Sequence, residues 1–212
     1  MNLETAAVVD VLVATGNPGK LREIREITAG LPVSWRALGE FPHVAEAVED
    51  GDTFAENARR KARYYSLATG LWTLADDSGL EVDALGGAPG VHSAYFAGLP
   101  RDDHANNRKL VAALAGVPAA QRTARFRCAL ALADGERILL EADGRVEGRI
   151  IDEPRGVNGF GYDPHFLVPE LGRTMAELPA AEKNARSHRG AALRALLRKL
   201  EALLRARGLW PA

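Results

Sequence analysis

Residues 8–20 read Val-Val-Asp-Val-Leu-Val-Ala-Thr-Gly-Asn-Pro-Gly-Lys, and this stretch decides the fold class. Val8 to Ala14 is largely apolar, as a buried strand is, and a Gly/Pro/Asn loop follows at once. Leu21, Ile24 and Ile27 then recur every third position, which predicts a helix from Leu21 to about Ala29 that ends at Gly30. A buried strand that leads through a tight loop into a helix is typical of the start of an α/β domain.

Further elements follow the same patterns. Thr53 and Glu56 have the spacing of a capping box and predict a helix through about Ala68. Residues 71–75 read as a short strand, 83–100 as a Gly/Pro-rich loop, and 103–115 as a helix. Residues 124–133 and 137–151 read as strands joined at Asp134-Gly135, a hairpin signal. A leucine-rich face predicts a last amphipathic helix, used for core or subunit contact: Leu193, Leu196, Leu197, Leu200, Leu203 and Leu204.

These elements predict an α/β fold in which helices flank a mixed β-sheet, with two lobes around a cleft. No repeat or linker interrupts the chain, so we expect one domain over residues 1–212.

The composition excludes several classes of protein. There are 27 basic and 28 acidic side chains, a net charge of -1, so we expect no nucleic-acid polymer as partner. No apolar run approaches the length of a membrane span, and Met1 to Thr5 lacks the pattern of a signal peptide. The single cysteine, Cys128, is expected to be a buried apolar residue in a reducing compartment. These features predict a cytoplasmic protein without membrane contact.

The loop Thr15-Gly16-Asn17-Pro18-Gly19-Lys20 is a candidate phosphate site. Small residues at a helix N-terminus let backbone N–H groups approach an anion, and a lysine reaches phosphate oxygens. It is not a Walker P-loop, because only two residues separate its glycines and Leu21 follows the lysine. A plain tight turn is the alternative.

Asp76 and Asp77 follow the apolar strand at 71–75 and precede Ser78. Successive strand residues point opposite ways, so at least one carboxylate should face the edge of the sheet where α/β proteins bind ligands. Carboxylates together with substrate phosphates suit Mg²⁺. The alternative is a capped turn. Spacing alone leaves the second metal carboxylate open among Glu49, Asp50, Asp52 and Glu56.

Two clusters in the last third carry aromatic and basic side chains. In the segment Gly159-Phe160-Gly161-Tyr162-Asp163-Pro164, a ring held between glycines is a candidate surface for stacking on a base. The alternative is a turn that buries both rings in the core. In residues 182–190, the side chains of Lys183, His188 and Arg189 gather hydrogen-bond donors near a helix start. A solvated basic helix end is the alternative there.

Taken in order, these clusters resemble the inosine triphosphate pyrophosphatase family. The likeness extends from about Val11 to Leu197. Its matching stretches, given by residue number, are 14–20, 54–58 with 61–62, 75–80, 82–91, 154–156, 159–164, and 182–184 with 187–190.

The resemblance implies an elongated mixed β-sheet flanked by helices, two lobes around a central nucleotide-binding cleft, and a catalytic core at about 8–205. It also implies hydrolysis of purine nucleoside triphosphates such as inosine and xanthosine triphosphates, to the monophosphate and pyrophosphate, usually by a homodimer with Mg²⁺. By similarity, Thr15 to Lys20 hold the triphosphate, with Lys61 as a further cation. Asp77 binds metal and accepts a proton from water, and Glu49 is favoured over Glu56 as the second metal ligand. Ser78 contacts substrate, and the base end is assigned to Phe160, Gly161, Tyr162, Asp163, Lys183, His188 and Arg189.

One position departs from the family pattern. Tyr95 stands where most bacterial relatives carry an arginine, so we expect altered efficiency with activity retained. Two other functions remain open. A pyrophosphatase of related fold could act on modified pyrimidine triphosphates, and a nucleotide sensor would bind without hydrolysis.

Overall fold

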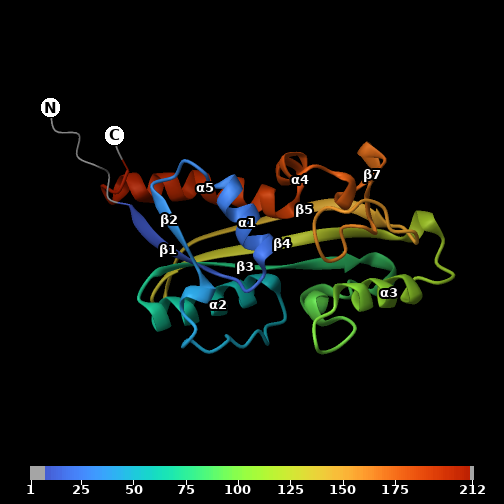
Figure 1. Ribbon diagram of the computed structural model, residues 1–212, viewed down its shortest axis with the longest axis horizontal. Coiled ribbons are helices and arrows are strands. Elements are labelled where there is room, and N and C mark those ends of the chain that lie inside the picture. Colours follow the sequence, from blue (N-terminus) through green and yellow to red (C-terminus); the bar gives the residue numbers. More distant parts are fainter. Residues whose placement is uncertain (1–7, 211–212) are drawn as a thin grey trace. The chain divides into compact units, whose positions relative to one another are not determined.

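The computed structural model describes residues 8–210 (Figure 1). The expectation drawn from Met1 to Thr5 lies outside the described residues. Within the described part, seven strands form one mixed sheet in the order β2-β1-β3-β4-β5-β6-β7. The predicted α/β class, with a mixed sheet flanked by helices, is therefore confirmed.

The chain divides into two compact units. Unit 1 comprises Met1–Asp77, Ala129–Asp143 and Ala192–Ala212, and unit 2 comprises Ser78–Cys128 and Gly144–Ala191. The division falls between Asp77 and Ser78, two successive residues of one strand. The single catalytic domain and the nucleotide-binding cleft expected from the sequence stay predictions.

Unit 1 begins with strand β1 (Val9–Ala14), helix α1 (Pro18–Ile27) and strand β2 (Val33–Ala37). Helix α2 (Phe54–Thr69) then leads into strand β3 (Trp72–Val82). β1 lies between β2 and β3 and is parallel to both. In Figure 1, α1 lies on one face of these strands and α2 on the opposite face. The last helix, α5 (His188–Ala206), buries Leu193, Leu196, Leu200 and Leu204 in the chain itself.

Unit 2 contains helix α3 (Asp103–Ala113) and the short helix α4 (Ala180–Arg186). Strands β4 (Thr123–Asp134) and β5 (Arg137–Ile150) run through both units and are neighbours in the sheet, as the Asp134-Gly135 signal predicts. The short strands β6 (Phe166–Val168) and β7 (Arg173–Thr174) extend the sheet with antiparallel pairing. The core of unit 2 includes Leu80, Leu110, Phe126, Tyr162 and Phe166.

Short 3₁₀ helices complete the chain, and two of them, η2 (Asp83–Leu85) and η3 (Gly90–Tyr95), lie in the Gly/Pro-rich segment expected to have little regular structure. The others are η1 (Leu38–Glu40), η4 (Ala119–Gln121), η5 (Pro169–Leu171) and η6 (Met175–Glu177). Cys128 is 1% exposed, which confirms its expected burial. Within the described residues, no helix is both long enough and apolar enough to cross a membrane.

Two boundaries predicted from the sequence are wrong. α1 begins at Pro18 and not at Leu21, because proline is well suited to the first helical position. β3 does not end at Ala75 but continues to Val82, since Leu80 and Val82 alternate as fully buried residues and Gly79 stays extended. The aspartate pair therefore lies inside a strand and not in a turn after one. β2, β6, β7 and α4 had no sequence signal strong enough to predict them.

Candidate active site

The loop after β1 is organised by a helix cap. The Asn17 side-chain oxygen accepts hydrogen bonds from the backbone N–H groups of Gly19, at 2.8 Å, and Lys20, at 3.2 Å. Asn17 in turn donates its own backbone N–H to the Thr15 hydroxyl. Two of the backbone N–H groups that we expected to bind phosphate therefore donate instead to Asn17, which caps the N-terminus of α1. The Lys20 ammonium group donates a hydrogen bond to Asp76 Oδ1 at 2.6 Å, so this lysine of the loop lies beside the aspartate pair.

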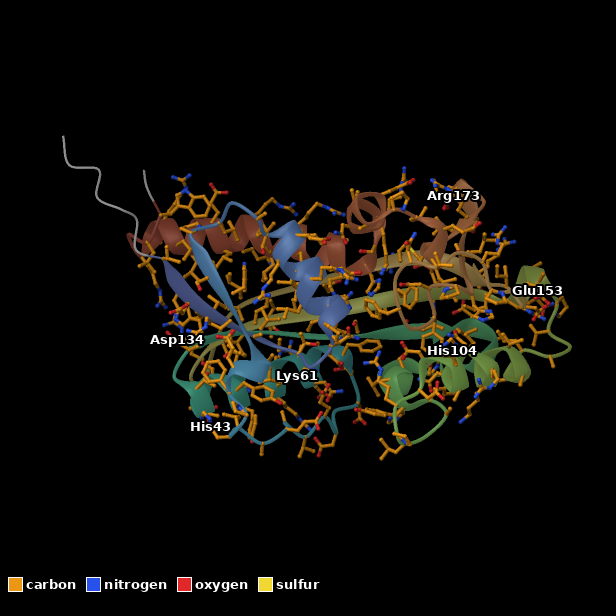
Figure 2. All side chains as sticks on the ribbon, viewed as in Figure 1. His43, Lys61, His104, Asp134, Glu153 and Arg173 are labelled. Carbon is orange, nitrogen blue, oxygen red and sulfur yellow. The ribbon has the colours of Figure 1, made fainter. Side chains whose placement is uncertain are left out.

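Asp76 and Asp77 are both buried, at 1% and 7% exposure. β1 pairs with β3 only as far as Ala14, opposite Ala75, so β3 carries the two aspartates past the end of its parallel neighbour. Successive strand residues face opposite sides of a sheet. Each aspartate accordingly meets a different lysine: Asp76 meets Lys20 of α1, and Asp77 lies 3.9 Å from the Nζ of Lys61 on α2. Lys61 is labelled in Figure 2.

Burial and neighbouring charges act in opposite directions on the pKa of the Asp77 carboxyl group. Burial raises the pKa of its carboxyl group from 3.8 to about 6, against the lowering influence of Lys61 and Lys20. Glu49, a like charge, adds to the increase in pKa. Its Oδ1 faces Lys61, whereas Oδ2 is buried without a hydrogen-bond partner among the described residues. A buried carboxylate oxygen without a hydrogen-bond partner lowers the stability of the fold unless a ligand or an ion binds to it.

The same group of residues suits a divalent cation. Lys61 Nζ bonds Glu49 Oε2 at 2.6 Å, so Glu49 and Asp77 share one ammonium group. Within residues 8–210, no three His, Cys, Asp or Glu side chains gather as a complete metal cage. Mg²⁺ typically takes one or two carboxylates from the protein and fills its remaining positions with water and phosphate. The unpartnered Asp77 Oδ2 fits such an ion.

The structure separates the two candidate glutamates. Glu49 lies at Lys61, as described, whereas Glu56 is directed to the start of α2. The Glu56 carboxylate accepts the backbone N–H of Asp52, and its own N–H donates to the Thr53 hydroxyl. Glu56 is therefore occupied as part of a helix cap, and the structure brings Glu49 and not Glu56 to the Asp77 group.

In unit 2, an aromatic loop centred on Phe160 is fixed by its neighbours. Gly159 and Gly161 have positive φ angles of 77° and 61°, which glycine adopts without strain. A Cβ on Gly159 would also clash with Asp163 Oδ2. That oxygen accepts the Phe160 N–H at 2.9 Å and the Lys183 ammonium at 2.8 Å. Asp163 thus ties the loop to α4.

The two rings of this loop have different environments. Phe160 is half-buried, with Lys183 Nζ at 4.6 Å and Arg189 Cζ at 5.6 Å from its ring centroid. Tyr162 is 5% exposed in the core of unit 2, and its hydroxyl donates to Ser93 O at 2.8 Å. Burial raises the pKa of Tyr162. Phe160 therefore keeps the ring available for stacking, whereas Tyr162 belongs to the core, as the alternative interpretation expected.

The basic residues at the α4–α5 junction are not solvated. Lys183, His188 and Arg189 are 5%, 7% and 1% exposed, so the alternative of a solvated helix end is wrong. Arg189 Nη2 donates to the Ser78 hydroxyl at 2.9 Å. The His188 ring stacks on Phe126, with centroids 4.9 Å apart and planes at 20°. Unit 2 thus gathers Ser78, Phe160, Asp163, Lys183 and Arg189 through direct contacts.

Two residues that contact the aromatic loop were missed by the sequence. Asp103 and Asn107 of α3 hydrogen-bond to the backbone of Gly161. An Asp in the first turn of a helix and an Asn inside it have many ordinary explanations, so no sequence signal singled them out.

The fold and these two groups define an α/β protein with a buried lysine–carboxylate group in one unit and a half-buried aromatic ring flanked by cations in the other. The sequence profile of the Ham1 family matches residues 11–199. The chain belongs to the Ham1 family.

Similar proteins agree over most of their length. A dITP/XTP pyrophosphatase of Desulforamulus reducens is 51% identical over 193 residues, which are 91% of this chain and 96% of that protein. A dITP/XTP pyrophosphatase of Geobacter sulfurreducens is 54% identical over 183 residues, 86% of this chain and 92% of that protein. The solved structure of a HAM1 protein from Coxiella burnetii has a TM-score of 0.84 at 44% identity, covering 92% of this chain and 99% of that one.

Proposed function

We propose that this chain hydrolyses non-standard purine nucleoside triphosphates, namely ITP, dITP and XTP, to the nucleoside monophosphate and pyrophosphate. The relatives named dITP/XTP pyrophosphatases support the substrate class. The observation that carries the proposal is the buried Asp77 carboxylate, whose Oδ2 has no hydrogen-bond partner while two lysines and Glu49 lie around it. Such a carboxylate suits a reaction that needs a cation, a base and a phosphate chain together.

The residues of unit 1 bind the phosphates and perform the chemistry. Hydrolysis adds one water across the anhydride between the α- and β-phosphates, and Asp77 accepts the proton that the water gives up. A pKa of about 6 keeps this carboxyl ionised at neutral pH and still basic. Lys20 and Lys61 balance the charge of the phosphates and of the departing pyrophosphate. The loop from Thr15 to Lys20, including Gly16, Asn17, Pro18 and Gly19, holds the triphosphate.

Mg²⁺ is the proposed cofactor, held by Asp77 and Glu49, and when bound it neutralises phosphate charge and polarises the reacting water. The shared contact of both carboxylates with the Lys61 ammonium supports this pair of ligands.

The residues of unit 2 bind the nucleoside. Phe160 stacks on the base, Gly161 and Asp163 shape the loop that carries it, and Ser78 contacts substrate. Tyr162 contributes to the base pocket indirectly, because it packs in the core of unit 2 and anchors the loop there. Donors from Lys183, His188 and Arg189 recognise the base end. The 6-keto oxygen of inosine and xanthosine accepts hydrogen bonds from such donors. The 6-amino group of adenine is itself a donor, so it would leave them without an acceptor. Unpaired buried donors give discrimination of roughly 10⁴-fold or more.

The proposal is tested by measuring Mg²⁺-dependent pyrophosphate release from ITP, XTP, GTP, ATP and a modified pyrimidine triphosphate in parallel. Fast release from ITP and XTP, with little from the others, is the expected result. Preferential release from the pyrimidine substrate would favour the pyrimidine pyrophosphatase. ITP binding without release from any substrate would leave a nucleotide sensor.

We also propose that the protein acts as a cytoplasmic homodimer whose residues 1–212 form one catalytic domain, with no nucleic-acid or membrane partner. The family resemblance supports the dimer and the single domain. The near-neutral charge supports the absence of a nucleic-acid partner, and the single buried cysteine suits the cytoplasm. Sedimentation equilibrium at micromolar concentration measures the oligomeric state, and a monomer there would contradict the dimer.

A further inference from the structure

The Gly161 peptide is held at both its polar groups by one helix of unit 2. Its N–H donates to Asp103 Oδ2 at 2.9 Å, and its carbonyl accepts from Asn107 Nδ2 at 2.9 Å. Asp103 and Asn107 are four residues apart on α3, so their side chains lie on the same face of the helix. We call these two hydrogen bonds the Gly161 clamp. Since Phe160 precedes Gly161, the clamp fixes the backbone directly next to the aromatic ring.

Asn107 contributes to the clamp at an energetic cost. Only its NH₂ group can donate to a carbonyl, so the contact with Gly161 O sets the orientation of the amide. The Asn107 side-chain oxygen is consequently buried, and it has no hydrogen-bond partner among the described residues. A buried acceptor without a partner lowers stability. Asn107 thus leaves its own oxygen without a partner while it supplies the donor to the Gly161 carbonyl, which an apolar side chain could not do.

The helix that carries the clamp is itself firmly placed within unit 2. Asp102 caps α3 by accepting the backbone N–H groups of His104 and Ala105, the former residue being labelled in Figure 2. The neighbouring Asn106 holds a different segment, because its amide bonds Ala94 O and Ala97 N. Leu110 anchors the helix in the core at 0% exposure. Adjacent asparagines on one rigid helix therefore serve two separate segments.

A second constraint on the same loop comes from the opposite direction along the chain. The Phe160 N–H donates to Asp163 Oδ2, which also binds Lys183. Side chains thus bind three backbone groups, the N–H of Phe160 and both polar groups of Gly161, while the Phe160 carbonyl between them accepts the backbone N–H of Asp163. Side-chain contacts of this kind position a loop without a strand or helix of its own.

We propose that Asp103 and Asn107 are positioning residues that hold the Phe160 ring in the orientation needed to stack on the purine base. This inference rests on the proposed function, because it concerns how that function's base end is built. Neither residue is assigned a contact with the substrate. Their effect is confined to the nucleoside, so a ligand that has phosphates but no base is bound independently of the clamp.

The test uses Asn107→Asp in the full chain, because aspartate has the same shape but cannot donate to Gly161 O when ionised. KM and kcat for ITP are measured together with the inhibition constant of inorganic tripolyphosphate, a base-free ligand. We expect KM for ITP to rise about 10-fold, the loss typical of one hydrogen bond whose buried partner is left unmet. The kcat value and the tripolyphosphate constant should each change less than about 2-fold, since the clamp touches neither phosphate nor Asp77.

Asn106→Ala is the matched control, as the same residue type is removed from the next position of the same helix. It should lower the melting temperature without changing the ratio between the KM for ITP and the tripolyphosphate constant. If Asn107→Asp fails to fold, Asp103→Ala provides the same test, because this substitution removes the other hydrogen bond of the clamp. The Asp103 side chain is 34% exposed, so its loss should be tolerated by the fold. Asp103→Asn, which keeps an acceptor for the Gly161 N–H, should restore most of the affinity.

An unchanged KM for ITP in the clamp variants would overturn the proposal, as would a parallel loss of ITP and tripolyphosphate affinity. Failure of the proposed function itself would appear differently, as absence of pyrophosphate release by the unmodified protein.

Discussion

Two buried aspartates, one in each unit, show how the units differ. In unit 2, Asp163 Oδ2 accepts both the Phe160 N–H and the Lys183 ammonium. In unit 1, Asp77 Oδ1 lies 3.9 Å from the Lys61 ammonium group, and Asp77 Oδ2 has no hydrogen-bond partner among the described residues. A satisfied buried carboxylate stabilises the structure around it, whereas an unsatisfied one is typical of a functional site. The comparison favours a structural role for Asp163 and supports the proposed catalytic role of Asp77.

The strands follow the same division. Unit 1 pairs β1 with β2 and β3 in parallel, and parallel strands bring their carboxyl ends, with the loops that follow, to one edge. The pairs β5–β6 and β6–β7 of unit 2 are antiparallel. In unit 2 a glycine-containing loop carries the key ring, and its position depends on side-chain contacts from α3 and α4.

The largest effect is expected from Asp77→Ala. This change removes the proposed base and a metal ligand together, so kcat for ITP should fall at least ~10³-fold. Circular dichroism should show an intact fold, because a small side chain replaces a carboxyl that is costly to bury. Pyrophosphate release is the measurement, and turnover within a few-fold of the unmodified protein would remove Asp77 from the chemistry.

Asp77→Asn tests, without a substrate, whether the ionised form of the buried Asp77 lowers the stability of the protein. The folded-state pKa of Asp77, about 6, lies above its ordinary value of 3.8, so its contribution to stability is greatest below pH 3.8 and is lost as the pH rises through 6. The metal-free variant should therefore be more stable than the unmodified protein at pH 7.5, by roughly 2–3 kcal/mol, and about equal to it near pH 4.

Urea unfolding with a chelator present measures this difference at each pH. Adding Mg²⁺ should stabilise the unmodified protein more than the variant, because the ion completes the Asp77 carboxylate. A variant less stable than the unmodified protein at pH 7.5 would show that the ionised Asp77 is favourable where it lies.

Phe160→Ala tests the aromatic ring of unit 2. Stacking of a base on an aromatic ring contributes about 1–3 kcal/mol, so KM for ITP should rise roughly 10- to 100-fold. The kcat value at saturating ITP should stay within about 3-fold, since Asp77 and its lysines are untouched. Steady-state kinetics separate the two parameters. A fall in kcat with KM unchanged would assign the ring to the chemical step.

Tyr95→Arg is expected to have the smallest effect. Tyr95 lies in η3 with 48% of its surface exposed, so an arginine side chain fits there without repacking the core. An added positive charge should raise kcat/KM for ITP about 2- to 5-fold at low salt and less at high salt. Equal values of kcat/KM for the two proteins at low salt would show that this position does not affect efficiency.

Much of the fold could be predicted from local signals. The cap at Thr53 and the Asp134-Gly135 turn correctly marked α2 and the β4–β5 connection. β2 was missed because the apolar–polar alternation of Val33–Ala37 covers only five residues, all of them only partly buried, and so gives a weak signal. The end of β3 was misjudged because two aspartates and a glycine read as a break, whereas burial of Leu80 and Val82 keeps the strand going.

The site could be predicted only in part, for a related reason. Motifs mark Asp77, Phe160 and Lys183, but the partners that each of them meets within its own unit come from other segments of the chain. The pairing of Glu49 with Lys61 joins a loop to a helix, and spacing alone could not choose Glu49 over Glu56. The Gly161 clamp spans 58 residues between Asp103 and Gly161. Hydrogen bonds over such separations follow from tertiary packing and leave no local pattern.

The most direct test of the central claim is ³¹P NMR of the products formed from ITP and from ATP with Mg²⁺. The account predicts that ITP gives only inosine monophosphate and pyrophosphate, while ATP stays intact over the same period. Formation of orthophosphate and inosine diphosphate, or equal consumption of ATP, would contradict the proposed reaction and its base selectivity.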